Sequence, residues 1–269
     1  MTIAHRMVVE QLSAGYGEKT ILQDVNLDIM PGKITAIVGA NACGKSTLLR
    51  TLSRLLAPTQ GQVLLDGKSV HHTPTRMLAR TLGLLPQSPI APEGITVGDL
   101  VGRGRHPHHQ FMSRWSSRDD EAVANALALT KTADLIDRDV DQLSGGQRQR
   151  VWIAMALAQE TDILLLDEPT TFLDVTHQID VLDLLVDLNL QRGVTIVMVL
   201  HDLNLAARYA DYLLAMKNGQ VHIHGEPPKV FTREMIQTVF GLNSHIIQDP
   251  ISHIPMMIPI GRHKQNTSL

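Results

Sequence analysis

The chain has 269 residues, a formal net charge of −3 and a single cysteine, Cys43. Hydrophobic residues make up 43% of it and charged residues 19%, which is typical of a globular protein and excludes a disordered one. One cysteine cannot form a disulfide within the chain, which fits a reducing compartment. The slightly acidic balance and the 3% aromatic content argue against a nucleic-acid-binding protein, which needs a basic stripe or stacking rings.

Neither a membrane span nor a secretory signal is expected. The apolar runs at 163–166 and 196–200 are much shorter than the ~20 residues that a spanning helix needs. Residues 1–12 lack the basic region and apolar stretch of a signal peptide. If the protein works at a membrane, we expect it to dock onto another protein that spans it.

The first part of the chain predicts hairpins. Apolar and polar residues alternate over 7–12 and again over 20–29, on either side of a turn expected at 15–17. Residues 61–70 contain an Asp-Gly turn between two short strand-like runs, which indicates another hairpin. These hairpins predict an antiparallel sheet beside the main sheet.

A glycine-rich loop follows a short apolar strand, expected over 33–38, and precedes a helix, expected over 45–56. The loop matches the phosphate-binding pattern GxxxxGK[ST] in full. Its backbone N–H groups and the helix N-terminus suit phosphate oxygens, while Lys45 supplies a positive charge and Ser46 a hydroxyl ligand for Mg²⁺. The predicted ATP-binding residues of the loop are Gly39, Ala40, Asn41, Ala42, Cys43, Gly44, Lys45, Ser46 and Thr47.

The sequence pattern changes in the middle of the chain. Strand-like runs disappear between about 88 and 160, and residues 117–129 have helical spacing with acidic residues in the first turn. This pattern predicts a helical insertion. After Gly241 an Ile- and Pro-rich tail is expected to add strands.

Strand and helix patterns then alternate, which predicts a parallel α/β sheet. Buried strands are expected over 163–166 and 194–200, and helices over 176–189 and 203–210. The first of these strands ends in Asp167 and Glu168, at the edge where α/β sheets place ligands. We expect Asp167 to hold Mg²⁺ and Glu168 to act as the general base toward water. With the glycine-rich loop, these carboxylates predict a P-loop NTPase.

A second glycine-rich segment precedes a helix expected over 148–160. Its residues are Leu143, Ser144, Gly145, Gly146 and Gln147. Ser144 can cap the helix, and the glycines allow a phosphate to approach the backbone amides. A nucleotide has only one γ-phosphate, so we expect two copies, head to tail, each offering this segment to the ATP of the other.

In this combination the sequence resembles the ATP-binding subunit of an ABC transporter over residues 7–243. The resemblance implies an α/β P-loop ATPase core with a parallel sheet, an antiparallel β subdomain and a helical signature subdomain at about 88–160. Residues 244–269 would form a C-terminal extension. Expected partners are a second copy and integral membrane permease subunits, at the cytoplasmic face of the inner membrane.

The resemblance also implies roles for four further residues. Tyr16 matches the aromatic that stacks on adenine, and Gln87 the glutamine that touches Mg²⁺ and the attacking water. Asp174 matches an aspartate that links the two subunits, although residues 171–173 read Thr-Phe-Leu instead of the common Ser-Ala-Leu. His201, after an apolar strand, matches the histidine that contacts the γ-phosphate.

Several segments narrow the resemblance to one group of importers. Residues 101–109 and 115–123 resemble importers of iron–siderophore complexes, haem and cobalamin. Residues 141–143, 148–160 and 169–174 are most similar to the ferric enterobactin type. We therefore expect ATP-driven import of an iron(III)–siderophore complex, with a periplasmic or lipoprotein binding protein in the same system. Haem or cobalamin import is the alternative, and a DNA-repair or translation ATPase and a P-loop kinase are more distant ones.

The histidines could form a metal site, and the cysteine could be reactive; each possibility has a structural alternative. A metal site could be built from His106, His108 and His109 or from His222 and His224, but we expect surface or docking histidines. Cys43 is expected to fill a small slot in its loop. Because a helix N-terminus can lower a thiol pKa, we also expect alkylation of Cys43 to block nucleotide binding.

Overall fold

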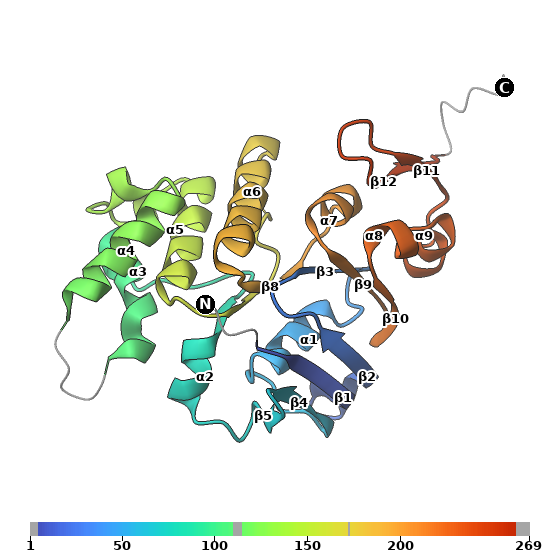
Figure 1. Ribbon diagram of the computed structural model, residues 1–269, viewed down its shortest axis with the longest axis horizontal. Coiled ribbons are helices and arrows are strands. Elements are labelled where there is room, and N and C mark those ends of the chain that lie inside the picture. Colours follow the sequence, from blue (N-terminus) through green and yellow to red (C-terminus); the bar gives the residue numbers. More distant parts are fainter. Residues whose placement is uncertain (1–4, 110–114, 172, 262–269) are drawn as a thin grey trace.

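The computed structural model describes residues 5–109, 115–171 and 173–261. Figure 1 shows two sheets in the middle of the molecule, a group of helices on one side and the C-terminal elements on the other. Within the described residues, no helix is both long enough and apolar enough to cross a membrane.

The larger sheet has six strands in the order β10-β9-β3-β8-β7-β6. Neighbouring strands are parallel except β9 and β10, which are antiparallel. In chain order the strands are β3 (Ile34–Gly39), β6 (Leu82–Leu85), β7 (Ile163–Leu166), β8 (Thr195–Val199), β9 (Tyr212–Lys217) and β10 (Gln220–Gly225). The predicted parallel sheet is confirmed, while β9 and β10 were not predicted.

Both faces of this sheet are buried, because successive side chains of a strand point to opposite faces. In β7, Ile163 and Leu165 enter the core shared with the antiparallel sheet. Leu164 and Leu166 enter the core shared with the helices of the other face. Continuous apolar strands of this kind are typical of parallel sheets covered on both sides.

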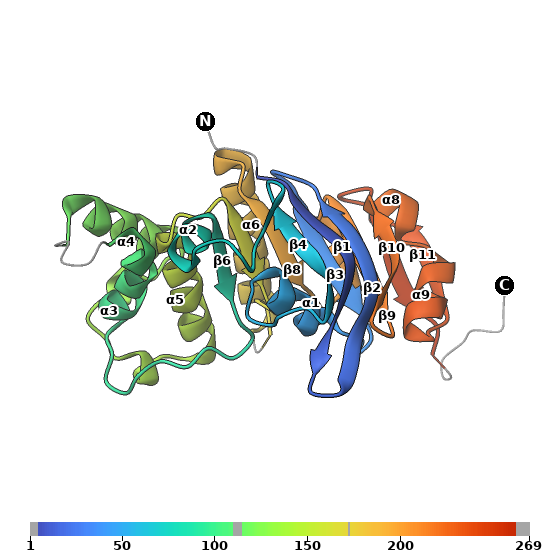
Figure 2. The same ribbon diagram turned by 90° about the horizontal axis from the view of Figure 1, so that it is seen from below.

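The smaller sheet is antiparallel, with the order β2-β1-β4-β5, and α1 (Lys45–Leu52) packs between it and the larger sheet (Figure 2). Its strands are β1 (Met7–Tyr16), β2 (Lys19–Ile29), β4 (Gln60–Leu65) and β5 (Lys68–Ser69). The turn expected at 15–17 lies instead at 17–18, since Tyr16 still pairs with Lys19. The helix expected to reach residue 56 ends at Leu52.

The predicted helical insertion is confirmed, and no strand begins in the described part of 88–160. Its helices are α3 (Val97–Gly102), α4 (Ser117–Leu129) and α5 (Gly145–Ala158), with 3₁₀ turns η1 (Arg103–His108), η2 (Ala133–Leu135) and η3 (Val140–Gln142). Arg105 is buried there and donates to Asp119 at 3.0 Å and to Glu160 at 2.8 Å. These two ion pairs join η1 to α4 and to the loop that enters β7.

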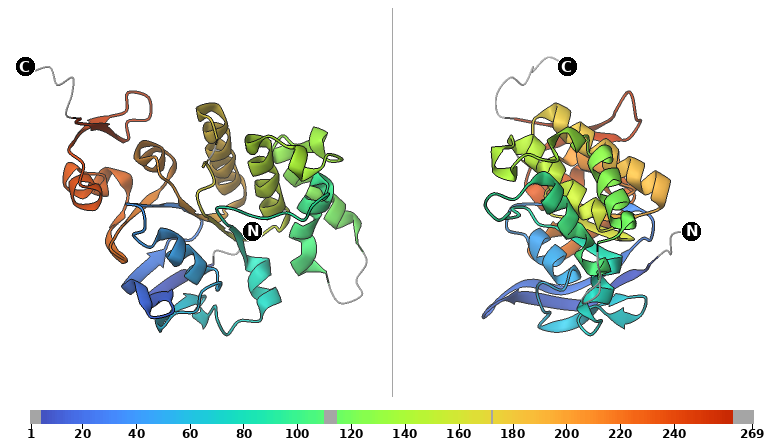
Figure 3. Two further views of the ribbon diagram at one scale, coloured as in Figure 1. Left: turned by 180° about the vertical axis from the view of Figure 1, so that it is seen from behind. Right: turned by 90° about the vertical axis from the view of Figure 1, so that its left-hand side faces the viewer.

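The remaining elements surround the sheets (Figure 3). They are α2 (Thr75–Thr81), α6 (Val175–Arg192), α7 (Leu203–Tyr209), α8 (Pro227–Val230) and α9 (Arg233–Phe240). The tail forms the expected strands, β11 (Ser244–Gln248) and β12 (Pro255–Pro259), as an antiparallel hairpin. Helices α2, α8 and α9 were not predicted.

Candidate nucleotide site

A cavity of about 470 Å³ lies where four parallel strands end. Gly39 is the last residue of β3, and the residues at 87, 168 and 201 each lie two positions after the end of β6, β7 and β8. Carboxyl ends of parallel strands are where open α/β sheets bind ligands. The cavity is lined by Tyr16, Lys19, Ile21, Asn41, Ala42, Gly44, Lys45, Ser46, Thr47, Gln87, Glu168 and His201.

Two glycines allow the phosphate-binding loop to take its path. A Cβ atom on Gly39 would lie 2.5 Å from the Met216 carbonyl oxygen, so only glycine fits there. Gly44 has φ +106° and is the N-cap of α1, which has no side-chain cap at that position. First-turn N–H groups without a side-chain acceptor are suited to bind a phosphate.

Lys45 is buried and turned toward its own loop. Its Nζ donates to the carbonyl oxygens of Gly39 at 2.9 Å and Ala40 at 3.1 Å. An ammonium group held among carbonyls in a buried position keeps a positive charge at the floor of the cavity. A phosphate entering the loop would gain that charge.

Ser46 and Asp167 come together from separate elements. The Ser46 hydroxyl donates to Asp167 Oδ1 at 3.1 Å. Burial raises the pKa of Asp167, and the neighbouring Glu168 charge raises it further. A hydroxyl and a carboxylate are the oxygen ligands that Mg²⁺ prefers, and a divalent cation would offset the buried negative charge. These residues therefore fit Mg²⁺.

Glu168 contacts polar groups from two other segments and from its own. Its Oε2 accepts from Gln87 Nε2 at 2.5 Å and from the Thr171 hydroxyl at 3.0 Å. Its Oε1 lies 2.6 Å from His201 Nε2. The backbone of Glu168 has φ +56°, a conformation that side-chain-bearing residues rarely take and that is common at functional sites. The structure thus joins three residues that the sequence places far apart.

Thr171 and Lys19 were missed by the sequence analysis. Thr171 follows Glu168 by three residues, and this short spacing was the signal that could have pointed to it. Lys19 reaches the cavity because it pairs with Tyr16 across the β1–β2 turn. Tyr16 itself is 47% exposed, and its hydroxyl lies 3.2 Å from Arg50 Nη1, which donates to it.

The second glycine-rich segment lies outside this cavity. Among the described residues that line the cavity, none comes from 143–147. Ser144 caps α5: its hydroxyl accepts from the Gln147 N–H at 3.3 Å, and its own N–H donates to Gln147 Oε1 at 3.1 Å. Ser144 and Gly145 are exposed, so the N-terminus of α5 faces outward.

Asp174 caps the next helix. Its Oδ1 accepts from the His177 N–H at 2.9 Å and lies 2.8 Å from His177 Nδ1. The backbone hydrogen bond from His177 is the main cause that lowers the pKa of Asp174. The side chain is 67% exposed, which leaves it accessible to another molecule. Phe172, in the segment before it, lies outside the described residues.

The prediction that the helix N-terminus lowers the pKa of the Cys43 thiol is wrong. Cys43 is only 6% exposed and belongs to the core shared by the two sheets. Burial raises the pKa of its thiol, against the smaller opposing effect of Lys45. A thiol with a raised pKa is less reactive than a free one. Burial agrees with the expected role of Cys43 as a small packing residue, and loss of nucleotide binding on alkylation stays a prediction.

The expectation of surface histidines holds only in part. His106 and His222 are exposed, but His108, His109 and His224 are partly buried. His108 Nε2 lies 2.8 Å from the Gln159 carbonyl oxygen, and the His224 ring lies 5.6 Å from that of Tyr212. These three histidines therefore pack against other parts of the chain.

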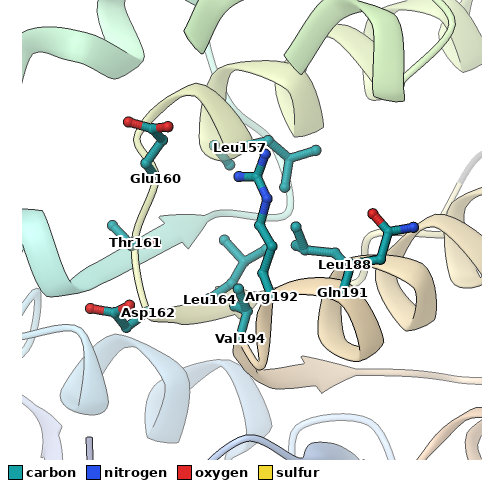
Figure 4. A pocket seen from close by; sticks show the side chains of 10 residues that line it. Leu157, Glu160, Thr161, Asp162, Leu164, Leu188, Gln191, Arg192 and Val194 are labelled. Carbon is teal, nitrogen blue, oxygen red and sulfur yellow. The ribbon is translucent and has the colours of Figure 1, made fainter. Parts of the chain in front are cut away.

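A further pocket of about 270 Å³ lies at the opposite edge of the sheet, where β7 and β8 begin (Figure 4). Glu160 and Asp162 line it from the loop before β7, and Arg192 extends into it from the end of α6. None of the predicted site residues lines this pocket. The convergence of predicted residues is therefore specific to the cavity at the carboxyl ends of the strands.

Comparisons with known proteins agree with this geometry. Residues 22–171 match the family described as ABC transporter. The chain is 54% identical to the probable siderophore transport system ATP-binding protein YusV of Bacillus subtilis (strain 168), covering 94% of this chain and 92% of that one. It is 50% identical to the ferric enterobactin transport ATP-binding protein FepC of Escherichia coli (strain K12), covering 98% and 97%. A dimeric structure of the bacterial ABC transporter cassette MJ0796 is 30% identical with a TM-score of 0.73, covering 82% and 98%.

Proposed function

The chain belongs to the ABC transporter family, and we propose that it is the ATP-hydrolysing subunit of an importer of iron(III)–siderophore complexes. Its relatives from Bacillus subtilis and Escherichia coli, named for siderophore and ferric enterobactin transport, support this cargo at 50% identity or more over nearly the whole chain. The observation that carries the ATPase role is the convergence of four strand ends on one cavity with Lys45, Glu168 and His201.

ATP occupies this cavity through three sets of contacts. Tyr16 stacks on the adenine, while the loop 39–47, of which residues 41, 42 and 44–47 line the cavity, encloses the phosphates. Ser46, Asp167 and Gln87 would hold Mg²⁺, which would supply neutralisation of the phosphate charge. The Ser46–Asp167 hydrogen bond of 3.1 Å supports this assignment, because it brings two oxygen ligands together before any ion arrives.

Glu168 serves as the general base. Its two oxygens contact Gln87, Thr171 and His201. When His201 turns to a γ-phosphate oxygen, Oε1 becomes free to accept a proton from the attacking water. Gln87 and Thr171 stay on Oε2 and keep the carboxylate oriented during that transfer.

Two copies of the chain close around two ATP molecules. Leu143, Ser144, Gly145, Gly146 and Gln147 contact the ATP held by the other copy, and Asp174 links the subunits. The outward-facing N-terminus of α5, away from the cavity of its own chain, supports this arrangement. The dimeric cassette of similar fold supports it as well.

Closure of the two copies drives a membrane permease. We place the chain at the cytoplasmic face of the inner membrane, docked onto integral permease subunits beside Gln87 and the helical insertion. A periplasmic or lipoprotein siderophore-binding protein delivers the cargo to the same system.

Uptake of radioactive iron tests this proposal. Cells lacking the chain are complemented with wild type or Lys45→Ala and offered iron as several siderophores, with haem and cobalamin in parallel. We expect uptake of one siderophore class to be lost and to return only with wild type. A defect restricted to haem or cobalamin would overturn the cargo and keep the ATPase, and normal uptake of every cargo would contradict the importer.

A further inference from the structure

We propose that Asn204 is a positioning residue for ATP hydrolysis, through which the C-terminal hairpin of β11 and β12 holds His201 in place. The inference rests on the proposed role of His201 and adds a regulatory connection to it. Figures 1 and 3 show the hairpin beside α7, the short helix that begins two residues after His201.

Asn204 joins this helix to the hairpin through two hydrogen bonds. Its Nδ2 donates to the Met257 carbonyl oxygen at 3.1 Å. The Met257 N–H donates back to Asn204 Oδ1 at 2.7 Å. The side-chain amide thus pairs with β12 as the backbone of a neighbouring strand would, using both a donor and an acceptor.

A second contact lies one helical turn further along the same face of α7. Arg208 Nη1 is 3.8 Å from Asp249 Oδ2, in the segment that connects β11 to β12. Residues four apart lie on one face of a helix, so Asn204 and Arg208 attach the hairpin along the length of α7. A small cavity of about 90 Å³, lined by Leu205 and Ile254, separates the two surfaces between these contacts.

The opposite face of α7 is fixed to the sheet. Leu203, Ala206 and Ala207 are buried in the core beneath it. Leu205 and Tyr209 of the same helix also pack against this core. The hairpin contacts α7 from the side that carries Asn204, so a change in the hairpin would be transmitted to the helix.

The helix in turn fixes the backbone at His201. Asp202 is the N-cap of α7, and its Oδ1 accepts from the N–H groups of Asn204 and Leu205 at 2.8 Å and 2.9 Å. His201 immediately precedes this cap and follows β8 by two residues. Its side chain is 47% exposed, so the position of its backbone largely determines which groups of the cavity the ring can reach.

The test compares Asn204→Leu with wild type. Leucine has a similar size but makes neither hydrogen bond to Met257. We expect kcat for ATP hydrolysis to fall roughly tenfold with KM for ATP unchanged, because misplacement of a catalytic group affects the chemical step. Asn204→Asp, which keeps the acceptor for the Met257 N–H, should give an intermediate kcat. Gln248→Leu is the matched control, since it makes the same amide-to-leucine change at an exposed residue of β11.

A double-mutant cycle with His201→Gln separates positioning from general support of the fold. Phosphate release is measured with enzyme in excess, which resolves slow rates. We expect Asn204→Leu to cause no further loss in the His201→Gln background. The same tenfold loss in both backgrounds, or a wild-type rate in Asn204→Leu alone, would overturn the inference while His201 keeps its role. A wild-type rate in His201→Gln would overturn the role of His201 and the inference with it.

Discussion

Helices α1 and α5 both begin at a glycine-rich loop, but their first turns have different surroundings. Gly44 leaves α1 without a side-chain cap, and groups from three other strand ends share its cavity. Ser144 caps α5 in a reciprocal pair with Gln147, and the first turn is exposed. The first loop is therefore surrounded by other groups of its own chain, whereas in the proposed dimer the second segment would be completed by groups of the other copy.

The largest expected effect is at the completed site. Glu168→Gln should lower the rate of ATP hydrolysis about 10²–10⁴-fold, because glutamine cannot accept the proton from water. ATP binding should persist, and the ATP-bound dimer should accumulate on size-exclusion chromatography. Asp162→Asn is the matched control, since Asp162 lies before the same strand at the opposite edge of the sheet. Hydrolysis at the wild-type rate by Glu168→Gln would refute the assigned base.

The second largest effect is expected from loss of the buried Lys45 side chain. Lys45→Ala should weaken ATP binding about 10–100-fold, the cost of one charged hydrogen-bond donor. Equilibrium binding of a fluorescent ATP analogue measures it. Lys33→Ala removes an exposed lysine at the other end of β3, where it pairs with Asp211 at 3.1 Å, and should bind as wild type. Equal affinity of wild type and Lys45→Ala would contradict the phosphate site.

The incomplete site should respond only when two copies meet. Ser144→Ala should lower turnover by about tenfold while ATP binding to the single chain stays unchanged. Removal of an N-cap also costs about 0.5–2 kcal/mol of stability. Thr232→Ala removes the comparable cap of α9, whose hydroxyl accepts from the Met235 N–H. If both variants lost the same stability and the same turnover, Ser144 would be a helix cap and no more.

The smallest effect concerns Asp167 without nucleotide. Burial raises its pKa above the ordinary value of 3.8, so the folded chain holds a proton that the unfolded chain has released. The free energy of unfolding therefore falls as the pH rises from the ordinary pKa of 3.8 to the raised pKa of the folded chain. Asp167→Asn should raise Tm by a few degrees at most at pH 8 and by less at pH 4, as scanning calorimetry at the two pH values would measure. A Tm difference independent of pH would contradict the raised pKa.

Local patterns were enough to predict the elements that frame the site. Strand β7 and the loop before α1 are continuous in sequence, so periodicity and spacing indicate them directly. The hydrogen bonds of Glu168 join residues 87, 168 and 201, and the strand order that brings them together depends on tertiary packing. Resemblance to a family supplied these roles where physical reasoning from one sequence could not.

Other features were beyond any local pattern. The pairing of Asn204 with Met257 links residues 53 positions apart, and nothing at either position indicates the other. Burial of Cys43 depends on the antiparallel sheet that covers it, so its thiol could not be assigned a pKa from its place in a loop.

Mixing two inactive variants tests most directly whether each ATP site is shared between two copies. Lys45→Ala impairs the loop of its own chain, and Gly146→Asp places a carboxylate where the second segment meets phosphate. A Cβ atom at Gly146 would lie 3.6 Å or more from its neighbours, which is an ordinary van der Waals distance, so a Cβ atom fits at this position. In a mixed dimer, purified with two tags, one site combines both defects and the other has an intact loop and an intact segment. We predict that the mixed dimer hydrolyses ATP although each variant alone does not. A mixed dimer as inactive as its parents would contradict the shared site.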